Sequence, residues 1–176
     1  MESLEGKKDS GTVNSQGDSK QKMIDGVQIR YAVTQVDERG TLTEIYNPAW
    51  GLIEEPLVYV YQASIQPGKI KGWVQHHLQT ERLFVSRGFL RFVLYDDRED
   101  SPTRGLINQV YLSEHNRGLL VVPRFVWHAL QNIGSQEAFF MNMPTVPYNH
   151  ANPDKFRLPL NTDKIPFSFV DRELGW

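Results

Sequence analysis

Residues that bind metals or move protons are concentrated between Gln75 and Gly88, where the chain reads QHHLQTERLFVSRG. This stretch places His77 and Glu81 four residues apart, directly before an apolar run. If the stretch is a β-strand, alternation of side chains puts Gln75, His77 and Glu81 on one face and turns His76 the other way. Polar, metal-competent groups among apolar ones are typical of a strand that lines a cavity. We therefore predict that His77 and Glu81 are the catalytic groups of such a cavity.

A second stretch, residues 118–132, reads GLLVVPRFVWHALQN and carries His128 in an apolar strand. A strand histidine opposite His77 and Glu81 would complete a site with two histidines and one carboxylate, with Gln75 as a further ligand. Such a set suits one divalent transition metal, namely Zn, Fe, Mn or Ni. The alternative is that His128 is a hydrogen-bonded core histidine and that Glu81 pairs with an arginine.

Composition excludes several other classes of site and of protein. The chain of 176 residues has no cysteine, so any metal must use nitrogen and oxygen ligands. A formal net charge of -2 gives no reason to expect nucleic acid or an anionic membrane as a partner. No apolar run approaches the roughly 20 residues of a membrane-spanning helix. Without a hydrophobic signal segment at the N-terminus, the expected location is the cytoplasm.

The order of polar and apolar segments predicts a disordered tail followed by one all-β domain. Residues 1–22 are rich in Ser, Gly, Lys, Gln and Asp, which cannot bury enough apolar surface to offset the entropy of ordering. Residues 23–176 form the single predicted domain, because short β-type runs alternate there with turn signals. The expected strands are Val27–Val36, Thr41–Tyr46, Leu57–Ile65, Trp73–Leu78, Glu81–Arg87, Phe89–Tyr95, Leu106–Leu112, Leu119–Val122, Trp127–Asn132 and Ala138–Met143. Short helical turns are expected at Asn149–Lys155 and Asp171–Leu174.

The two histidine-bearing stretches resemble the two signature motifs of the cupin superfamily, G-x5-H-x-H-x3,4-E-x6-G and G-x5-P-x-G-x2-H-x3-N. The matching residues are His77, Glu81, Gly88, Pro123, His128 and Asn132. Gln75 replaces the first histidine of the first motif, and Phe125 replaces the central glycine of the second. The resemblance implies a cupin-type double-stranded β-helix, that is, a jelly-roll barrel.

Three segments narrow this resemblance to one family. Residues 37–44 read DERGTLTE and follow D-x-R-G-x-F-x-E, and residues 95–105 read YDDREDSPTRG and follow V-D-x-R-x-x-S-P-T-x-G. Residues 119–130 follow L-x-I-P-x-G-F-A-H-G-F. Together these segments are similar to the dTDP-4-dehydrorhamnose 3,5-epimerase family, over about residues 27 to 160. Its members epimerise a 4-keto-6-deoxy sugar carried on a nucleotide.

The family's chemistry, proton removal next to a ketone, needs a histidine base backed by an aspartate, a lysine for the enolate oxygen and a tyrosine that returns the proton. In this chain the base position holds Val74, the lysine position falls on Glu81 or Arg82, and the tyrosine falls near Phe140 and Met141. The family's catalytic residues are therefore absent from these positions. A bound metal would polarise the carbonyl instead of the lysine, with Glu81 or His76 as the base.

The resemblance also implies a nucleotide site. The predicted substrate-binding residues are Arg39, Glu44, Gln62, Ser64, Lys71 and Arg82. Arg39 and Glu44 match residues that meet the nucleotide of a neighbouring subunit, whereas Leu42 replaces the aromatic residue that would pack on the base. Lys71 keeps the positive charge of an arginine near the diphosphate and loses its bidentate fork. The alternative is that Arg39 and Glu44 are a surface ion pair beside a hairpin.

Three functions remain open on the sequence. The first is a nucleotide-sugar epimerase or isomerase, the second a metal-dependent cupin dioxygenase or lyase acting on a small molecule, and the third a sugar-nucleotide binding module without catalysis. The resemblance also implies a homodimer whose subunits exchange a strand. The predicted first strand, Val27–Val36, suits that role because an unpaired edge invites pairing.

Overall fold

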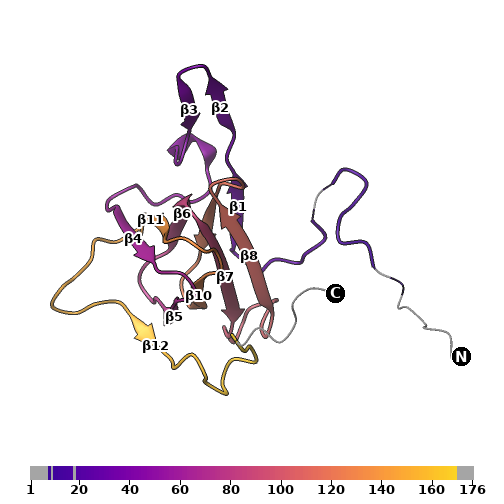
Figure 1. The fold of residues 1–176 in the computed structure, drawn as a ribbon. Coiled ribbons are helices and arrows are strands. Elements are labelled where there is room, and N and C mark those ends of the chain that lie inside the picture. Colours follow the sequence, from indigo (N-terminus) through magenta and orange to yellow (C-terminus); the bar gives the residue numbers. More distant parts are fainter. Residues whose placement is uncertain (1–7, 9, 18, 170–176) are drawn as a thin grey trace, which may run out of the picture.

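The computed structural model describes residues 8, 10–17 and 19–169, and it is built almost entirely of β-strands (Figure 1). The strands are β1 (Gln28–Tyr31), β2 (Thr34–Asp37), β3 (Gly40–Thr43), β4 (Tyr61–Ile65), β5 (Ile70–Gln75), β6 (Glu81–Arg87), β7 (Phe89–Asp96), β8 (Ile107–Ser113), β9 (Gly118–Val122), β10 (Val126–Asn132), β11 (Ala138–Asn142) and β12 (Phe156–Arg157). A short 3-10 helix, η1 (Pro48–Trp50), follows β3. In this part of the chain no helix is long and apolar enough to span a membrane.

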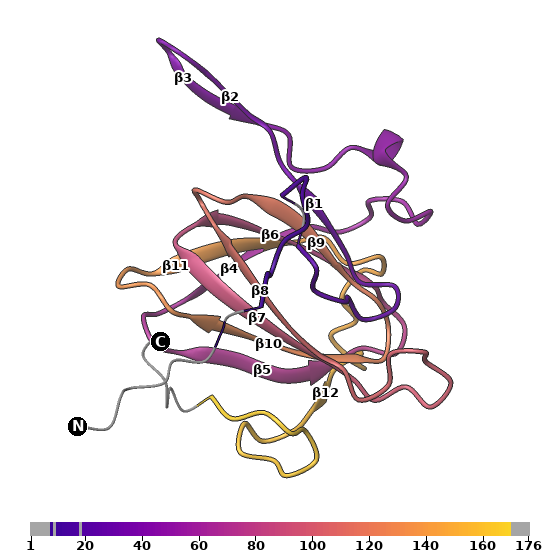
Figure 2. The same cartoon turned by 90° about the vertical axis from the view of Figure 1, so that its right-hand side faces the viewer.

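The strands form two five-stranded antiparallel sheets that face each other (Figure 2). The first sheet has the order β1-β9-β6-β11-β4 and the second the order β12-β5-β10-β7-β8. Along the chain, β6 belongs to the first sheet, β7 and β8 to the second, β9 to the first, β10 to the second and β11 to the first. This passage between facing sheets is the jelly-roll barrel of the cupins, so the predicted fold class is confirmed.

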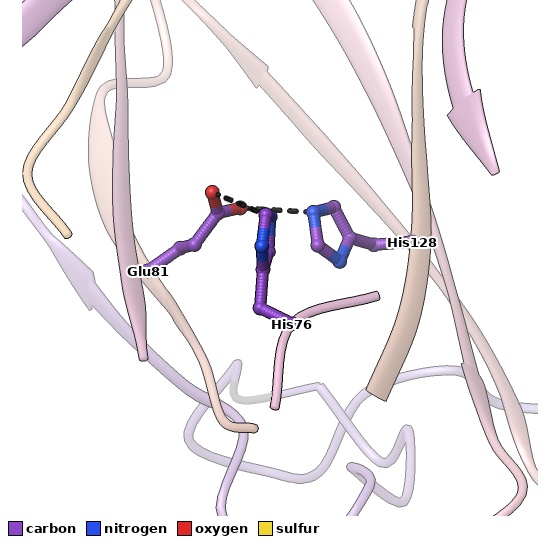
Figure 3. Close-up of side chains that lie close together, drawn as sticks. All are labelled: His76, Glu81 and His128. Carbon is purple, nitrogen blue, oxygen red and sulfur yellow. Dashed lines mark ion pairs between the residues drawn. The ribbon is translucent and has the colours of Figure 1, made fainter. Parts of the chain in front are cut away.

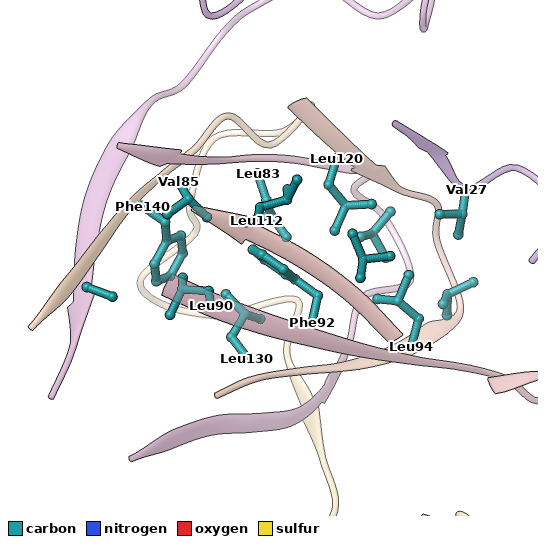
Figure 4. Packing of buried hydrophobic residues seen from close by; sticks show 14 of the residues in the cluster. Val27, Leu83, Val85, Leu90, Phe92, Leu94, Leu112, Leu120, Leu130 and Phe140 are labelled. Carbon is teal, nitrogen blue, oxygen red and sulfur yellow. The ribbon is translucent and has the colours of Figure 1, made fainter. Parts of the chain in front are cut away.

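The barrel interior is filled by alternate side chains of both sheets (Figure 4). On β6, Leu83 and Val85 are buried against residues of the second sheet such as Phe92 and Leu130. Burying an aliphatic side chain of this size contributes about 1.5–3 kcal/mol. The same alternation brings Glu81, the first residue of β6, into the interior, where it is 4% exposed. The alternation that places Leu83 and Val85 in the core therefore also places the carboxylate of Glu81 in the barrel interior.

The segment predicted as the first strand, Val27–Val36, is broken in two. Residues 28–31 pair with β9 of the same chain, whereas Thr34–Asp37 pair with β3 in a separate hairpin that projects from the barrel (Figure 1). The prediction of one continuous strand was wrong because Ala32 and Val33 make the turn away from the sheet edge. Exchange of the segment Val27–Val36 between the subunits of a homodimer stays a prediction.

Several other predicted elements differ from the structure. The strand predicted at Leu57–Ile65 begins at Tyr61, and the strand predicted at Thr41–Tyr46 ends at Thr43. Strand β5 ends at Gln75, so the predicted strand through Leu78 stops earlier and residues 76–80 form a loop. The segment Asn149–Lys155 has no helical turn, whereas Asp171–Leu174 lies outside the described residues. In the predicted tail, Val13 and Ser19 form an isolated β-bridge. Disorder of that segment stays a prediction.

Candidate active site

Three buried side chains from different elements meet inside the barrel near one end (Figure 3). Glu81 begins β6, His128 lies on β10 of the opposite sheet, and His76 belongs to the loop after β5. Nε2 of His76 lies 3.1 Å from Oε1 of Glu81, and Nε2 of His128 lies 2.8 Å from Oε2. Each of the three residues is at most 5% exposed. We call this group the His–Glu–His cluster.

The second nitrogen of each imidazole faces a main-chain carbonyl oxygen. Nδ1 of His76 contacts the carbonyl of Asp154, and Nδ1 of His128 lies 3.2 Å from the carbonyl of Val126. A carbonyl only accepts hydrogen bonds, so each Nδ1 carries a proton. Each Nε2 then needs a second proton, or a cation between it and Glu81, because two lone pairs would otherwise face each other. The cluster is built to hold positive charge around one carboxylate.

The ionisation of the cluster follows from this arrangement. Burial acts to raise the pKa of Glu81, yet attraction to His128 and His76 holds that pKa well below its usual range. Burial acts to lower the pKa of His76, but the hydrogen bond and the charge of Glu81 hold it above its usual value. Nδ2 of Asn142 also donates to Oε1 of Glu81 at 2.7 Å. Glu81 is therefore an ionised carboxylate near neutral pH.

The structure brings His76, and not His77, to Glu81 and His128. The ring of His77 stacks on Phe156 at 3.7 Å between centroids, outside the cluster, and its Nε2 lies 2.9 Å from Oε1 of Gln75. The sequence argument assumed one strand through Glu81, whereas a loop intervenes and shifts the alternation by one. The prediction that Gln75 and His77 share the inner face with Glu81 was wrong for this physical reason.

Two cavities adjoin the cluster and share three lining residues, Tyr61, His76 and Lys155. The smaller cavity, of about 290 Å³, is lined also by Glu81 and by the cations Lys71 and Arg157. The larger cavity, of about 470 Å³, is lined also by the following residues: Tyr59, Leu78, Val146, Pro147, Tyr148 and His150. A cationic compartment beside an aromatic one suits a ligand with an anionic part and a ring.

Tyr61 stands where both cavities meet. Its hydroxyl accepts a hydrogen bond from Nδ2 of Asn142 at 2.8 Å, and the same amide group contacts Glu81. Burial, together with the charge of Glu81, raises the pKa of Tyr61 to about 12. The phenol therefore keeps its proton at neutral pH and is able to donate it.

Of the residues predicted to bind substrate, the structure brings Lys71 alone to these cavities. Gln62 and Ser64 alternate on β4 with Tyr61 and Ala63, which line the smaller cavity, so they point to the other face.

Arg82 alternates in the same way with Glu81 and lies outside the cavities. Its Nη2 donates to the carbonyl oxygens of Glu55 and Pro56 at 2.5 and 3.3 Å. Within a single chain, Arg82 is therefore a structural residue and not a cavity residue.

Arg39 and Glu44 lie on and just beyond the β2–β3 hairpin, away from the cavities of their own chain (Figure 1). Arg39 pairs with Asp37 at 2.5 Å and is not paired with Glu44, so the predicted surface ion pair has a different partner. A role for Arg39 and Glu44 at a neighbouring subunit's nucleotide stays a prediction.

Comparison with known proteins places this barrel in a family. The model of the dTDP-4-dehydrorhamnose 3,5-epimerase family matches residues 21–169. The chain belongs to this family. This chain is 31% identical to the probable low-salt glycan biosynthesis epimerase Agl13 of Haloferax volcanii over 137 residues, which are 77% of this chain and 88% of that protein. It is 33% identical to the spore coat polysaccharide biosynthesis protein SpsL of Bacillus subtilis over 150 residues, which are 84% of this chain and 97% of SpsL.

A solved structure supports the same placement. The crystal structure of a dTDP sugar isomerase from Desulfovibrio desulfuricans superposes with a TM-score of 0.78 and 28% identity, over 86% of this chain and 95% of that one. The sugar-nucleotide epimerases thus supply both the sequence family and the fold of this chain.

Sequence reasoning missed Tyr61, Lys155 and Arg157 as site residues. Tyr61 follows an irregular segment, and Lys155 and Arg157 belong to a C-terminal segment with no strand signal. One signal was available for His76: it lies two residues after Val74, which falls on the family's base position and so on the inner face of the strand. Counting from Val74 along β5, instead of back from Glu81, would have turned His76 inward.

Proposed function

We propose that this family member epimerises or isomerises a 4-keto-6-deoxy sugar carried on a dTDP-type nucleotide, by moving a proton next to the ketone. The observation that carries the proposal is the position of His76. The family's base falls on Val74, and His76 presents an imidazole to the same cavity two residues later, backed by the carboxylate of Glu81. In this proposal the base is His76 and its acidic partner is Glu81, at positions that differ from the family's, and the reaction remains proton transfer next to a ketone.

The proposed reaction uses groups on the cavity wall. In the resting cluster Nε2 of His76 carries the proton that faces Glu81, so that proton leaves to solvent before the reaction. Nε2 of the neutral ring then takes the proton from the carbon beside the ketone, and Glu81 stabilises the imidazolium that forms. The electron pair of the broken C–H bond moves to the ketone oxygen as an enolate. Tyr61, which keeps its phenolic proton, returns a proton to the carbon. Glu81 remains a predicted catalytic residue, whereas His76 takes the role predicted for His77.

The test is exchange of solvent deuterium into a dTDP-4-keto-6-deoxyhexose, followed by NMR. Wild-type protein is expected to label the carbon next to the ketone, Glu81→Gln to lose exchange by about 100-fold or more, and Tyr61→Phe by about 10–100-fold. The matched control is His115→Ala, because His115 lies on an exposed loop. If wild-type protein binds the nucleotide sugar without any exchange, it is a binding module and the proposal is wrong.

A metal-dependent cupin reaction, as in a dioxygenase or lyase, is the second candidate, and the geometry of the imidazoles favours it. Both Nδ1 atoms donate to carbonyls, an arrangement that fixes the ring and presents Nε2 to a metal. His76, Glu81 and His128 offer ligand atoms within 4.8 Å of one another. Two histidines and a carboxylate would leave coordination positions open for a substrate.

Metal content of the purified protein separates the two candidates. One transition metal per chain in wild-type protein, lost in His128→Ala and kept in His115→Ala, would support the metal-dependent reaction. Deuterium exchange that continues after chelation and removal of the metal would favour the metal-free epimerase. These outcomes differ because the epimerase mechanism needs Nε2 of His76 free to take up a proton, whereas a bound metal would occupy that lone pair.

A further inference from the structure

Residues 154–157, which we call the strap, contribute two side chains to the wall of the smaller cavity. Within the strap, Phe156 and Arg157 form β12, which pairs with the end of β5 at Gln75 and Val74. Lys155 and Arg157 both line the smaller cavity, whereas Phe156 between them stacks on His77. This alternation turns two cations of the strap toward the His–Glu–His cluster.

Asp154 fastens the strap to the loop that carries His76. Its carboxylate accepts hydrogen bonds from the main-chain N–H groups of His77, Leu78 and Gln79 at 2.9, 2.8 and 3.2 Å. Its own carbonyl oxygen contacts Nδ1 of His76. Charge-assisted hydrogen bonds of this kind are stronger than neutral ones. The strap and the imidazole of His76 are therefore held as one unit.

Lys155 is the strap residue that lines both cavities. In the described part of the chain its ammonium group has no hydrogen bond or ion pair, although the charge of Glu81 acts on it. Partial desolvation of this largely exposed side chain, followed by the charges of Arg157 and Lys71, lowers the pKa of Lys155. A cation without a partner among the described residues is available to an anionic group of a ligand.

The strand position where the family carries its lysine falls on Glu81 or Arg82, and of these two only Glu81 lines the cavity. Glu81 there would repel a developing enolate, and the cluster neutralises it with two imidazoles instead of supplying a free cation. A metal-free epimerase therefore needs its positive charge from another element. Among the cations on the cavity walls, Lys71 and Arg157 line only the smaller, cationic cavity. Lys155 lines both the smaller cavity and the larger, aromatic one.

We propose that Lys155 is the catalytic residue that stabilises the enolate oxygen, delivered by the strap instead of by a barrel strand. This inference rests on the proposed epimerase function. As the C–H bond breaks, its proton goes to His76 and its electron pair reaches the ketone oxygen, which accepts a hydrogen bond from the ammonium of Lys155. When the carbon regains a proton, the electron pair returns and the ketone re-forms, so no oxidant or reductant is needed.

The experiment compares Lys155→Met, Lys155→Arg and the control Lys164→Met, because Lys164 is an exposed lysine of the same segment of the chain. Deuterium exchange into the dTDP-4-keto-6-deoxyhexose gives kcat and KM for each protein. Loss of an oxyanion-stabilising donor typically costs about 100–1,000-fold in kcat, so Lys155→Met should lose that much with KM changed less than about fivefold. Lys155→Arg, which keeps the charge, should recover part of kcat.

The outcomes separate this inference from the proposed function. Exchange by wild-type protein that persists within about threefold in Lys155→Met would overturn the role of Lys155 and leave the epimerase intact. A higher KM with unchanged kcat would also overturn it, since Lys155 would then only bind substrate. Absence of exchange in wild-type protein would reject the epimerase and, with it, this role. Thermal unfolding of Lys155→Met beside Lys164→Met shows whether the fold is retained.

Discussion

Nε2 of His128 lies 2.8 Å from Oε2 of Glu81, and this contact joins the two facing sheets of the barrel. His128 lies on β10 and Glu81 on β6, so the contact spans the interior at the level where the apolar core gives way to the cavities. Breaking one partner of a buried ion pair leaves the other charge without compensation. The contact is therefore structural as well as chemical.

The first prediction concerns this contact. We expect His128→Ala to lower the free energy of unfolding by about 3 kcal/mol, because buried Glu81 loses a charged partner and a void forms. Urea unfolding of the metal-free protein measures the change. The control His115→Ala should change stability by less than about 0.5 kcal/mol, because an exposed loop residue has few contacts to lose. Equal stability of the two variants would contradict the ion pair.

The second prediction concerns pH. The pKa of His76 is raised in the folded chain, so its contribution is complete below 6.5, its usual value, and is lost as pH rises through the folded pKa. The pKa of Glu81 is lowered, so its contribution is complete above 4.5 and is lost as pH falls through the folded pKa. The cluster of the metal-free chain should therefore stabilise most between these two values. Thermal unfolding across pH should show the decline above the window in wild-type protein and not in His76→Gln.

The third prediction separates two adjacent histidines. His76→Ala should lose deuterium exchange by about 100-fold or more, because the proton-accepting imidazole is removed. His77→Ala should keep exchange within about fivefold, since this ring stacks on Phe156 outside the cluster, and should lose about 1 kcal/mol of stability. The reverse order of activity would show that the strand alternation through Glu81, and not the loop, describes the working protein.

The fourth prediction concerns the anchor of the strap. Asp154→Asn removes the negative charge that three main-chain N–H groups share, so stability should fall by about 1–2 kcal/mol. Because the loop also orients His76, kcat should fall about tenfold while KM changes little. Kinetics and urea unfolding are compared with Asp100→Asn, which alters an exposed carboxylate. A variant with lower stability and normal kcat would mean that Asp154 supports the fold alone.

The fifth prediction concerns the approach of β5 to β10. A Cβ built on Gly72 would lie 2.4 Å from Cβ of Ala129 and 2.9 Å from the carbonyl oxygen of His128, at a φ of +144°. Gly72→Ala should therefore force these strands apart and cost about 2–4 kcal/mol. Gly105→Ala is the control, because it has a positive φ of +83° with no atom within 4 Å of the added Cβ. A similar loss in both variants would assign the effect to φ and not to the strand contact.

The sequence by itself determined the barrel and much of its wall. Alternation of apolar residues predicted β6 at Glu81–Arg87 with its observed bounds, and it placed Glu81 on the core side with Leu83 and Val85. His128 was likewise predicted on an inward strand position, and the structure buries it to 2% exposure. These predictions hold because alternation is a local property of any residue within one strand.

The tertiary structure decided which residues complete the site. His76 replaces His77 because residues 76–80 form a loop, and the hydrogen bonds that shape this loop come from Asp154, far along the chain. Lys155 also reaches the cavity through a distant partner. It precedes β12, a two-residue strand that the local sequence does not predict and that forms by pairing with the end of β5. Alternation fixes directions inside a strand, whereas the conformation of a loop depends on distant partners. The core could therefore be predicted from alternation alone, whereas the choice between His76 and His77 depended on where β5 ends and the loop begins.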